Sequence, residues 1–349
     1  MKLFHMSHTD MDGYGCQLIS KKVFPTGYFL NANYGLEVKL FTKEILERIK
    51  REPKEQEMLF LITDLNLTPD ESKDLNNKIN KLNEQGYNIK LQLLDHHGTG
   101  AKSAAKYEWY FLDTSRSATK ITYDYFKENY PEFGQKCEKN FDKLVQAINA
   151  ADIWLSDDEL FEYGKVCMSM VAKSYEINNS LFPDLHRDYK HFLMTKCLEF
   201  IDEKDGYIKL DESIYFYKKE YLNKGSNNDS MDNLSSKYLV DALESKKEDL
   251  TVYYKEHKGL LTYCLGGISI PANAFLKANP DFDFFIDVNR RGRAGFRADN
   301  KVDVSVLAGK LANGGGHPNA SGAAFDDFKE TVIYDDVKKY IQEKLDKCD

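Results

Sequence analysis

Short apolar runs alternate with helix-like stretches over the first 130 residues, and this alternation constrains the fold more than any other feature. The apolar runs are KLFHMS (2–7), MLFLITDL (58–65) and IKLQLLDHH (89–97), and the helical patterns lie around 39–51, 69–85 and 116–130. A strand, helix, strand order that repeats in this way predicts an open parallel sheet with helices on both faces. We therefore expect an α/β fold in this part of the chain.

Acids and imidazoles follow the ends of these three runs. His8, Asp10 and Asp12 come after the first run, Asp64 ends the second, and Asp95, His96 and His97 end the third. Ligands of open parallel sheets bind at the carboxyl ends of the strands. The sequence therefore predicts a functional site built from these three strand ends.

The stretch SHTDMDGYGC follows the first run. If it continues as an extended strand end, the alternating residues His8, Asp10 and Asp12 point to one side and can converge on a cation. Gly13 and Gly15 then let the backbone turn tightly into a helix. A polar loop with a helix cap is the alternative interpretation.

Asp64 closes the run MLFLITD, where an aspartate is commonly the N-cap of the next helix. Thr68 and Pro69 offer a better helix start, with threonine at the cap and proline in the first turn. We therefore expect Asp64 to be free for another role. Asp152 ends the helix-like stretch FDKLVQAINAAD, and its neighbours Ala150, Ala151 and Trp154 indicate a packed interior.

The stretch LLDHHGTG places Asp95, His96 and His97 where a buried strand meets a loop. Removing charged groups from water costs several kcal/mol each unless a partner of opposite sign is present, and a divalent cation is such a partner. Successive histidines point in different directions, so one can bind metal while the other faces substrate. A pair of surface loop histidines is the alternative.

Six candidate metal ligands result, none of them a thiolate: His8, Asp10, Asp12, Asp64, His96 and Asp152. Carboxylates with a few imidazoles suit Mn²⁺ or Mg²⁺, and occasionally Co²⁺ or Zn²⁺. Six ligands exceed what one metal draws from a protein. The set therefore predicts two metals that share a bridging carboxylate and clamp the two oxygens of a phosphoryl displacement.

Composition excludes several other classes of protein. The six cysteines form no C-x-x-C pair, which argues against a disulfide framework and against a cysteine-rich zinc site. The formal net charge of -8 opposes binding to long duplex nucleic acid. No apolar stretch reaches the roughly 20 residues of a membrane span, and the first residues do not resemble a signal peptide. We expect a cytoplasmic protein with reduced thiols.

The 349 residues predict about two domains with a connection between them. Residues 185–256 are charged and helical in pattern, interrupted by KGSNNDSMDN (224–233), which has the composition of an exposed turn. After 257, strand-like runs and a glycine-rich stretch indicate a small mixed α/β domain. We expect a catalytic domain at 1–184, a helical linker at 185–256 and a substrate-binding domain at 257–349.

Three further segments offer groups that could hold a phosphate. FDFFIDVNRRGRAGFRA reads as two strands joined by a turn, with Arg293 and Arg297 on one face of the second strand, and paired arginines can grip phosphate oxygens. GGGHPNASG offers backbone N–H groups and one imidazole, from Gly314, Gly315, Gly316 and His317. Arg116 stands at a helix start that could attract an anion, although a surface arginine is the alternative.

Five stretches of the chain together resemble the DHH phosphoesterases. SHTDMDGYG, the aspartate of LITD, LLDHH and NAAD occur in the order of the metal motifs of that family, and GGGHPNASG is similar to the glycine-rich loop of its associated C-terminal domain. The resemblance covers roughly 1–155 and 257–325 and leaves the middle unmatched. It implies an Mn²⁺-dependent hydrolase with two ions, Mg²⁺ or Co²⁺ being alternatives, and an active site in the interdomain cleft.

The resemblance also implies a role for each residue. His8, Asp10 and Asp64 would hold one metal, and Asp12, Asp64, His96 and Asp152 would hold the other, with Asp64 as the bridge. His97 would contact the scissile phosphate, and Asp95 would orient a histidine. The position of the first histidine is open, because some branches of the family place it further upstream and His5 is nearby.

The motif SHTDMDGYGC is most similar to the short-RNA exonuclease branch. This resemblance implies hydrolysis of short oligoribonucleotides to 5′-mononucleotides. A cyclic nucleotide or cyclic dinucleotide phosphodiesterase is one alternative, and a catalytically silent nucleotide-binding or RNA-binding protein is another. The partners we expect are short RNA or a nucleotide phosphodiester, without membrane or long duplex nucleic acid, and a homodimer is compatible with the sequence.

Overall fold

The computed structural model describes residues 1–223 and 229–348. The chain divides into two compact units. The N-terminal unit comprises Met1–Ser174 and Arg187–Tyr217, and the C-terminal unit comprises Tyr175–His186 and Lys218–Asp349.

The N-terminal unit is built on a parallel sheet of five strands in the order β2-β1-β3-β4-β5. The strands are β1 (Lys2–Ser7), β2 (Tyr28–Asn31), β3 (Glu57–Thr63), β4 (Asn88–Asp95) and β5 (Tyr110–Leu112). The predicted parallel sheet is confirmed, although the sequence pattern did not reveal β2 and β5. Because the chain moves from β1 outward to β2 and then back past β1 to β3, the carboxyl ends of β1 and β3 flank a topological switch point, where open sheets bind ligands.

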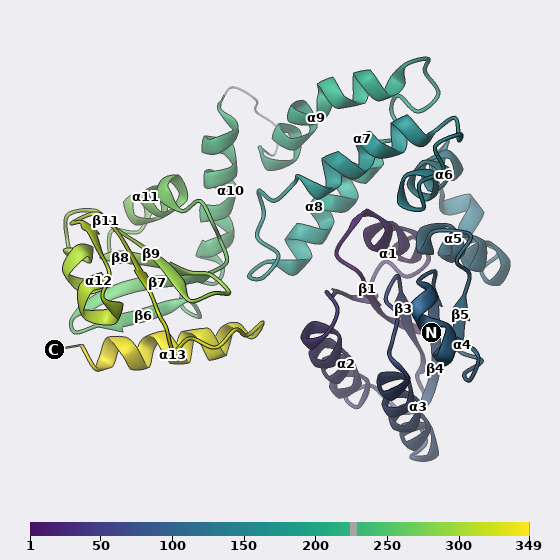
Figure 1. The fold of residues 1–349 in the computed structure, drawn as a ribbon, viewed down its shortest axis with the longest axis horizontal. Coiled ribbons are helices and arrows are strands. Elements are labelled where there is room, and N and C mark those ends of the chain that lie inside the picture. The colour runs from purple at the N-terminus through teal and green to yellow at the C-terminus, as the bar shows by residue number, and fades with distance from the viewer. Residues whose placement is uncertain (224–228, 349) are drawn as a thin grey trace. The chain divides into compact units, whose positions relative to one another are not determined.

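Helices cover both faces of this sheet (Figure 1). They are α1 (Met11–Val23), α2 (Leu36–Ile49), α3 (Pro69–Glu84), the short α4 (Ala101–Ala104) and α5 (Ala118–Asn129). Apolar residues of α2 and α3, such as Ile45 and Ile79, pack with Phe60 and Ile62 of β3 in one core. Figure 1 shows α1 on the opposite side of the strands.

The start of α3 agrees with the sequence interpretation. Thr68 is the N-cap, its side chain accepts from the Glu71 N–H, and Glu71 accepts in return from the Thr68 N–H. Pro69 occupies the first turn. This capping box satisfies helix-terminal N–H groups without Asp64, so Asp64 is free for another role, as predicted.

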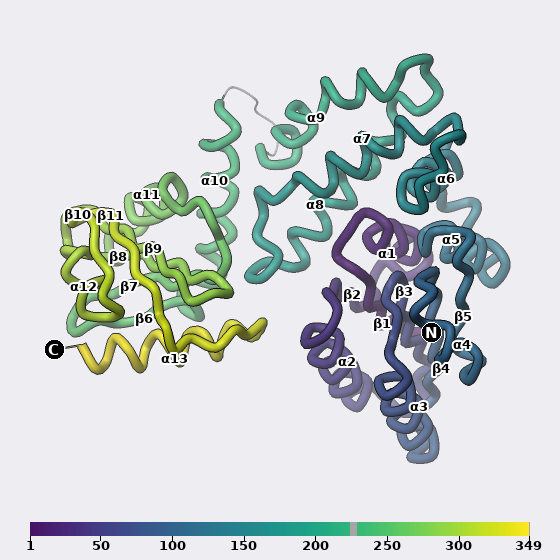
Figure 2. Tube along the Cα trace, viewed as in Figure 1, coloured from purple at the N-terminus to yellow at the C-terminus, as the bar shows by residue number. Residues whose placement is uncertain are grey.

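Four helices follow the sheet of the N-terminal unit along the chain (Figure 2). They are α6 (Phe141–Asp152), α7 (Phe161–Ala172), α8 (Pro183–Lys196) and α9 (Gly206–Leu222). The division between the two units falls within α8 and within α9. The helical character expected for the middle of the chain is therefore present, and α10 (Met231–Glu244) continues it. Of the predicted turn 224–233, residues 224–228 lie outside the described residues, and its last residues begin α10.

The C-terminal unit contains a mixed sheet of six strands in the order β10-β11-β9-β8-β7-β6. The strands are β6 (Thr251–Tyr254), β7 (His257–Tyr263), β8 (Phe284–Val288), β9 (Arg293–Ala298), β10 (Gly315–His317) and β11 (Ala320–Ala324). Besides α10, the helices α11 (Ser269–Ala278), α12 (Val304–Ala312) and α13 (Tyr334–Asp346) belong to this unit. The mixed α/β character predicted for this region is confirmed.

β8 and β9 form the antiparallel pair expected from the sequence, and their turn contains Gly292 at a φ of 71°. Phe296 is buried, whereas Arg293 is exposed and Arg297 is partly exposed. Alternation along the strand therefore puts the two arginines on the face opposite Phe296, as predicted.

None of the helices among the described residues has the length and apolarity that a membrane span requires. All six cysteines are unpaired, in agreement with the absence of a disulfide framework.

Candidate metal centre

The first ligand segment leaves the sheet as a helix start rather than as an extended strand. β1 ends at Ser7, and Asp10 is the N-cap of α1, where its Oδ1 accepts from the Gly13 N–H at 3.0 Å. The prediction that His8, Asp10 and Asp12 alternate along a strand end is therefore wrong. His8 and Asp10 still meet, because His8 Nδ1 lies 2.8 Å from Asp10 Oδ2.

Gly13 makes this tight turn sterically possible. A Cβ at this position would lie 2.4 Å from the His8 carbonyl oxygen, closer than any real carbon can approach. The glycine therefore lets the backbone of α1 pass directly beside His8.

Asp12, in the first turn of α1, is held by the N-terminus of α5. Its Oδ2 accepts from the Ala118 N–H at 2.7 Å, and its Oδ1 accepts from the Thr119 N–H at 2.8 Å. The Thr119 hydroxyl donates to the Asp12 carbonyl oxygen at 2.7 Å. Free N–H groups of a helix N-terminus stabilise a carboxylate, so the Asp12 side chain is both buried and fixed in direction.

Asp64 follows β3 and occupies the centre of the cluster. Its backbone has a φ of 55°, a left-handed conformation that costs a residue with a Cβ about 1–2 kcal/mol. Its Oδ2 lies 3.8 Å from His8 Nδ1, and its Oδ1 lies 3.3 Å from His96 Nε2. The two oxygens of one carboxylate thus face two different histidines, as the predicted bridging role of Asp64 requires.

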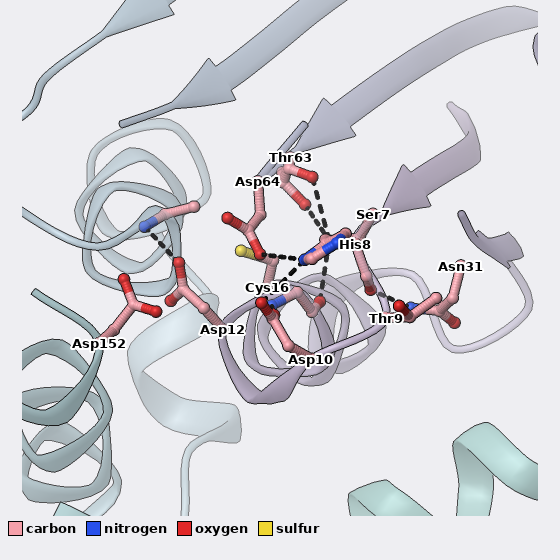
Figure 3. A network of polar contacts seen from close by, with 12 residues as sticks. Ser7, His8, Thr9, Asp10, Asp12, Cys16, Asn31, Thr63, Asp64 and Asp152 are labelled. Atoms are coloured by element: carbon pink, nitrogen blue, oxygen red, sulfur yellow. Dashed lines mark hydrogen bonds and ion pairs between the residues drawn. The ribbon is translucent and has the colours of Figure 1, made fainter. Parts of the chain in front are cut away.

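His96 and Asp152 complete the second half of the cluster. His96 Nε2 lies 3.6 Å from Asp152 Oδ2 and 3.8 Å from Asp12 Oδ2. Figure 3 shows His8 and Asp10 beside Asp64, and the carboxylates of Asp12 and Asp152 facing each other. Asp152 is the last residue of α6, so this helix delivers a carboxylate from outside the sheet.

The environment of Asp152 differs in part from the sequence expectation. Ala150 and Ala151 are buried as expected, but the Trp154 side chain is 65% exposed. The Leu155 N–H donates to the Ala150 carbonyl at 2.8 Å, and Trp154 has a φ of 58°. This is the pattern of a helix C-terminus closed by a left-handed residue, which turns the chain outward. Trp154 therefore does not face a packed interior.

The second histidine of the pair is oriented by Asp95. His97 Nδ1 lies 2.8 Å from Asp95 Oδ1, and the Tyr110 hydroxyl donates to Asp95 Oδ2 at 3.2 Å. Asp95 is buried, so both oxygens are fixed. The hydrogen bond that His97 donates to the Asp95 carboxylate raises the pKa of His97. Because Nδ1 is engaged, Nε2 is the ring nitrogen of His97 that can face another group.

The carboxylates of the cluster repel one another in a buried environment. Burial raises the pKa of Asp64 well above its ordinary value, and the charges of Asp12 and Asp10 raise it further. Burial and the charge of Asp12 raise the pKa of Asp152 to about 9, and burial also raises the pKa of Asp12. Burial also raises the pKa of Asp10, but the hydrogen bond between Asp10 and His8, together with weaker interactions, outweighs this effect and lowers the pKa of Asp10 to about 2.

This electrostatic pattern fits a bound cation. Asp64 Oδ2 and Asp152 Oδ2 are buried without a hydrogen-bond partner, although buried polar atoms are normally satisfied. A divalent ion would supply both the missing partner and the missing positive charge. Among the described residues, three groups each offer atoms that could bind a metal and that lie within 4.8 Å of one another: His8, Asp10 and Asp64; Asp12, His96 and Asp152; and Asp64, His96 and His97.

The first two groups, joined by Asp64, contain the six ligands that the sequence predicted. Carboxylate oxygens and imidazole nitrogens suit manganese or magnesium. The individual ligand roles and the identity of the metal stay predictions.

His5 is engaged elsewhere, which bears on the choice between His5 and His8. His5 Nδ1 lies 2.7 Å from Ser20 Oγ, and Nε2 lies 2.8 Å from Thr63 Oγ1. The ring is fully buried, and both nitrogens have partners. His8 is therefore the histidine after β1 that can serve as a ligand.

Arg116 lies at the start of α5 but is paired with carboxylates. Its guanidinium contacts Asp113 at 2.7 Å and Asp124 at 2.6 Å, and Ser117 rather than Arg116 caps the helix. The structure does not bring Arg116 into any of the three ligand groups. Its contact with substrate stays a prediction.

The glycine-rich stretch forms a strand pair where the sequence suggested a loop. Gly315, Gly316 and His317 make up β10, which pairs with β11. Gly314 precedes it, and a Cβ there would lie 2.3 Å from the Gly322 carbonyl oxygen. The side chain of His317 is exposed. Arg297, on the neighbouring β9, donates to Ser269 Oγ at 2.8 Å. Phosphate binding by this region stays a prediction.

Two groups at the site were missed by the sequence interpretation. Thr119 and the α5 N-terminus hold Asp12 from more than a hundred residues away, and Tyr34 lies with its ring centroid 5.3 Å from that of His8. Tyr34 follows β2, so recognising the short strand YFLN would have placed it at the same sheet edge as the other site residues.

Known proteins are similar to this chain over most of its length. No protein-family model matches the chain. The chain is 43% identical over 343 residues, 98% of each protein, to a 3′,5′-cyclic-nucleotide phosphodiesterase of Helicobacter pylori. It is 27% identical over 334 residues to the oligoribonuclease NrnB of Bacillus subtilis, covering 93% of this chain and 73% of that protein.

A solved structure has the same fold along its whole length. This is the crystal structure of an uncharacterized protein from Helicobacter pylori G27, with a TM-score of 0.88, 42% identity and coverage of 99% of both chains. With the ordered motifs, the ligand cluster at the switch point and a relative of this similarity over nearly its full length, the chain belongs to the DHH family of phosphoesterases.

Proposed function

We propose that the protein is a metal-dependent phosphodiesterase that opens 3′,5′-cyclic nucleotides, with two Mn²⁺ ions as the natural cofactor. The observation that carries this proposal is the position of Asp64, whose two oxygens face His8 and His96 in separate ligand groups. The substrate class is supported by the 43% identical relative, which covers nearly the whole chain.

The proposed reaction is the hydrolysis of one ester bond. A water oxygen becomes bonded to phosphorus, the bond from phosphorus to the 3′ oxygen breaks, and the released 3′ oxygen becomes a hydroxyl by taking the proton that the attacking water loses. The product is a nucleoside 5′-monophosphate. Two divalent ions in such a site supply an activated water and neutralise charge on the attacking and leaving oxygens.

The residues of the chain have separate tasks in this reaction. The α5 N-terminus fixes the direction of the Asp12 carboxylate, and Asp64 joins the two ligand groups. Asp95 holds Nδ1 of His97, which leaves Nε2 to donate to a phosphate oxygen. This arrangement places charge before the substrate arrives, so that little reorganisation is needed during the reaction.

Short oligoribonucleotides are a second candidate substrate. Their support is the 27% identity to an oligoribonuclease and the similarity of SHTDMDGYGC to that branch of the family. The chemistry is the same, because cleavage from phosphorus to the 3′ oxygen also releases a 5′-mononucleotide. Identity along the chain favours the cyclic nucleotide as the first candidate.

A parallel assay separates these candidates. The purified chain with Mn²⁺ is given 3′,5′-cyclic AMP, 3′,5′-cyclic GMP, a cyclic dinucleotide, an RNA dinucleotide, an RNA 24-mer and pyrophosphate, and the products are separated by chromatography. We expect 5′-monophosphate from the cyclic mononucleotides at a higher kcat/KM than from the dinucleotide. Asp64→Asn is the inactive control.

Two results would contradict the proposal. Faster turnover of the RNA dinucleotide than of either cyclic mononucleotide would make the second candidate the better one. A lack of turnover of every phosphodiester, with Mn²⁺ bound, would favour a protein that binds nucleotides without hydrolysing them.

A further inference from the structure

Tyr34 lies against two of the three histidines of the site, His8 and His97. Its ring centroid is 5.3 Å from that of His8 and 6.0 Å from that of His97. Its hydroxyl oxygen is 3.5 Å from His97 Nδ1. The side chain is nevertheless 44% exposed, so it forms part of the accessible wall of the site rather than part of the core.

The loop that carries Tyr34 is held in place by its neighbours. The Ala32 N–H donates to the Ser7 carbonyl at 2.8 Å, and the Asn33 N–H donates to Glu37 Oε2 at 2.7 Å. The Thr9 hydroxyl donates to Asn33 Oδ1 at 2.8 Å. These bonds tie the loop both to the end of β1 and to the start of α2, which preorganises the ring beside the ligands.

The hydroxyl of Tyr34 retains a proton that it can donate. His97 Nδ1 is already engaged by Asp95 at 2.8 Å, which is much shorter than its 3.5 Å separation from Tyr34. A contact of 3.5 Å is too long for a strong hydrogen bond. A half-exposed phenol beside a buried acidic cluster therefore has a proton to offer to an anion that enters the site.

We propose that Tyr34 is a substrate-contacting residue whose hydroxyl donates a hydrogen bond to a non-bridging phosphate oxygen, next to the one contacted by His97. The inference rests on the proposed phosphodiesterase activity, but it does not depend on which nucleotide is the substrate. Two donors on one side of the phosphate would stabilise the negative charge that develops during hydrolysis.

The decisive comparison is between removal of the hydroxyl and removal of the whole ring. Tyr34→Phe keeps the contact with His8 and His97 but loses the donor, and Tyr34→Ala loses both. Tyr253→Phe is the matched control, because Tyr253 is 52% exposed and lies in β6 of the C-terminal unit. Each variant is assayed with Mn²⁺ and bis(p-nitrophenyl) phosphate, a phosphodiester without a nucleoside.

We expect Tyr34→Phe to lower kcat/KM by about 100- to 1000-fold, the range for loss of one donor to a developing charge. Tyr34→Ala should lower it at least as much, and Tyr253→Phe should leave it unchanged. The Mn²⁺ affinity of Tyr34→Phe, measured by calorimetry, should equal that of the unchanged protein, because a phenol hydroxyl outside the ligand set is not needed to bind the metal.

Two outcomes would overturn the inference. If Tyr34→Phe is as active as the unchanged protein and only Tyr34→Ala is impaired, the ring merely packs against the histidines. If Tyr34→Phe loses Mn²⁺ affinity in proportion to its activity, the hydroxyl acts on the metal site instead of on the substrate.

A binding measurement separates failure of this inference from failure of the proposed function. If the unchanged protein hydrolyses no phosphodiester, the affinity for inorganic phosphate in the presence of Mn²⁺ is measured by calorimetry instead. Weaker phosphate binding by Tyr34→Phe would support the contact, and equal binding by both proteins would overturn it.

Discussion

Asp64 has several features that lower the stability of the folded protein. It is buried, its backbone is left-handed, and its Oδ2 lacks a hydrogen-bond partner. Neighbouring carboxylates raise its pKa further. Local strain of this kind persists at functional sites when the surrounding structure enforces it. Asp64 thus lowers the stability of the folded protein because it lies between the two ligand groups.

Asp64→Asn should separate stability from function. Asparagine tolerates the left-handed backbone and removes one charge from a repelling cluster. In the presence of EDTA we expect the free energy of unfolding to rise by about 1 kcal/mol, the size of a typical single-site effect. Urea denaturation provides the measurement, and hydrolysis should be lost. Asp241→Asn, on the exposed side of α10, is the control. A metal-free variant less stable than the parent protein would contradict the repulsion argument.

His5 predicts a dependence of stability on pH. Burial, with a smaller effect of the Arg187 charge, lowers its pKa from the ordinary value of 6.5 to about 3. The folded protein therefore keeps His5 neutral while the unfolded chain takes up a proton. Stability from this group is fully present above pH 6.5 and is lost progressively as the pH falls from 6.5 toward 3.

The slope attributable to His5 is about 1.4 kcal/mol per pH unit in this window. Urea denaturation between pH 5 and pH 6.5 should show it, and His5→Asn should reduce the slope by the contribution of one proton. His191 is also buried with a lowered pKa, mainly because of its burial, so a second slope of the same sign will persist in that variant. An unchanged slope in His5→Asn would contradict the assignment.

At the scale of elements, the site depends on how α1 and α5 pack against each other. Gly15 of α1 faces Thr119 of α5, and a Cβ on Gly15 would lie 2.3 Å from Thr119 Oγ1. Thr119 in turn donates to Asp12 from both its backbone and its hydroxyl. The close approach of the two helices is therefore a condition for the orientation of the Asp12 carboxylate.

Gly15→Ala should damage both stability and metal binding. The added methyl group has to displace Thr119, and overpacking of this kind costs about 1–3 kcal/mol. Thermal unfolding should report the loss of stability, and Mn²⁺ titration calorimetry should show weaker binding because Asp12 loses its fixed direction. Gly134→Ala is the matched control, since a Cβ there meets no atom within 4 Å. Equal Mn²⁺ affinity in both variants would argue against a role of this packing in the site.

At the scale of the whole molecule, the six candidate ligands all belong to the N-terminal unit. A ligand that binds only the folded state stabilises the part of the protein that contains its site, by about 2.7 kcal/mol at a concentration 100-fold above its Kd. Binding of metal should therefore stabilise the N-terminal unit against unfolding.

Differential scanning calorimetry of the intact chain tests this expectation. Mn²⁺ should raise the transition temperature of the N-terminal unit, and EDTA should reverse the change. Hydrogen exchange of the amides in β7 and β8 reports unfolding of the C-terminal unit. Mn²⁺ should slow this exchange less than it stabilises the N-terminal unit. A shift confined to the C-terminal unit would mean that the metal binds elsewhere.

The sequence by itself determined the order and type of the main elements of the N-terminal sheet. Long apolar runs with a strand pattern, such as 58–65, carry their own signal, and so does the cap formed by Thr68 before Pro69. Because parallel strands end at a common edge, the candidate ligands after β1, β3 and β4 could also be predicted. Short strands such as YFLN and YFL, with four and three residues, are too brief for a periodic signal and were missed.

Only the tertiary structure decided how the ligands converge and what surrounds them. His8 is favoured over His5 as a candidate ligand because His5 bonds to Ser20 of α1 and Thr63 of β3, and the orientation of Asp12 depends on the N-terminus of α5. The outward turn of Trp154 depends on a helix end that no pattern of apolar residues reveals. Patterns of polarity are local along the chain, whereas these contacts join residues that are far apart in sequence, so they are defined only when the chain has folded.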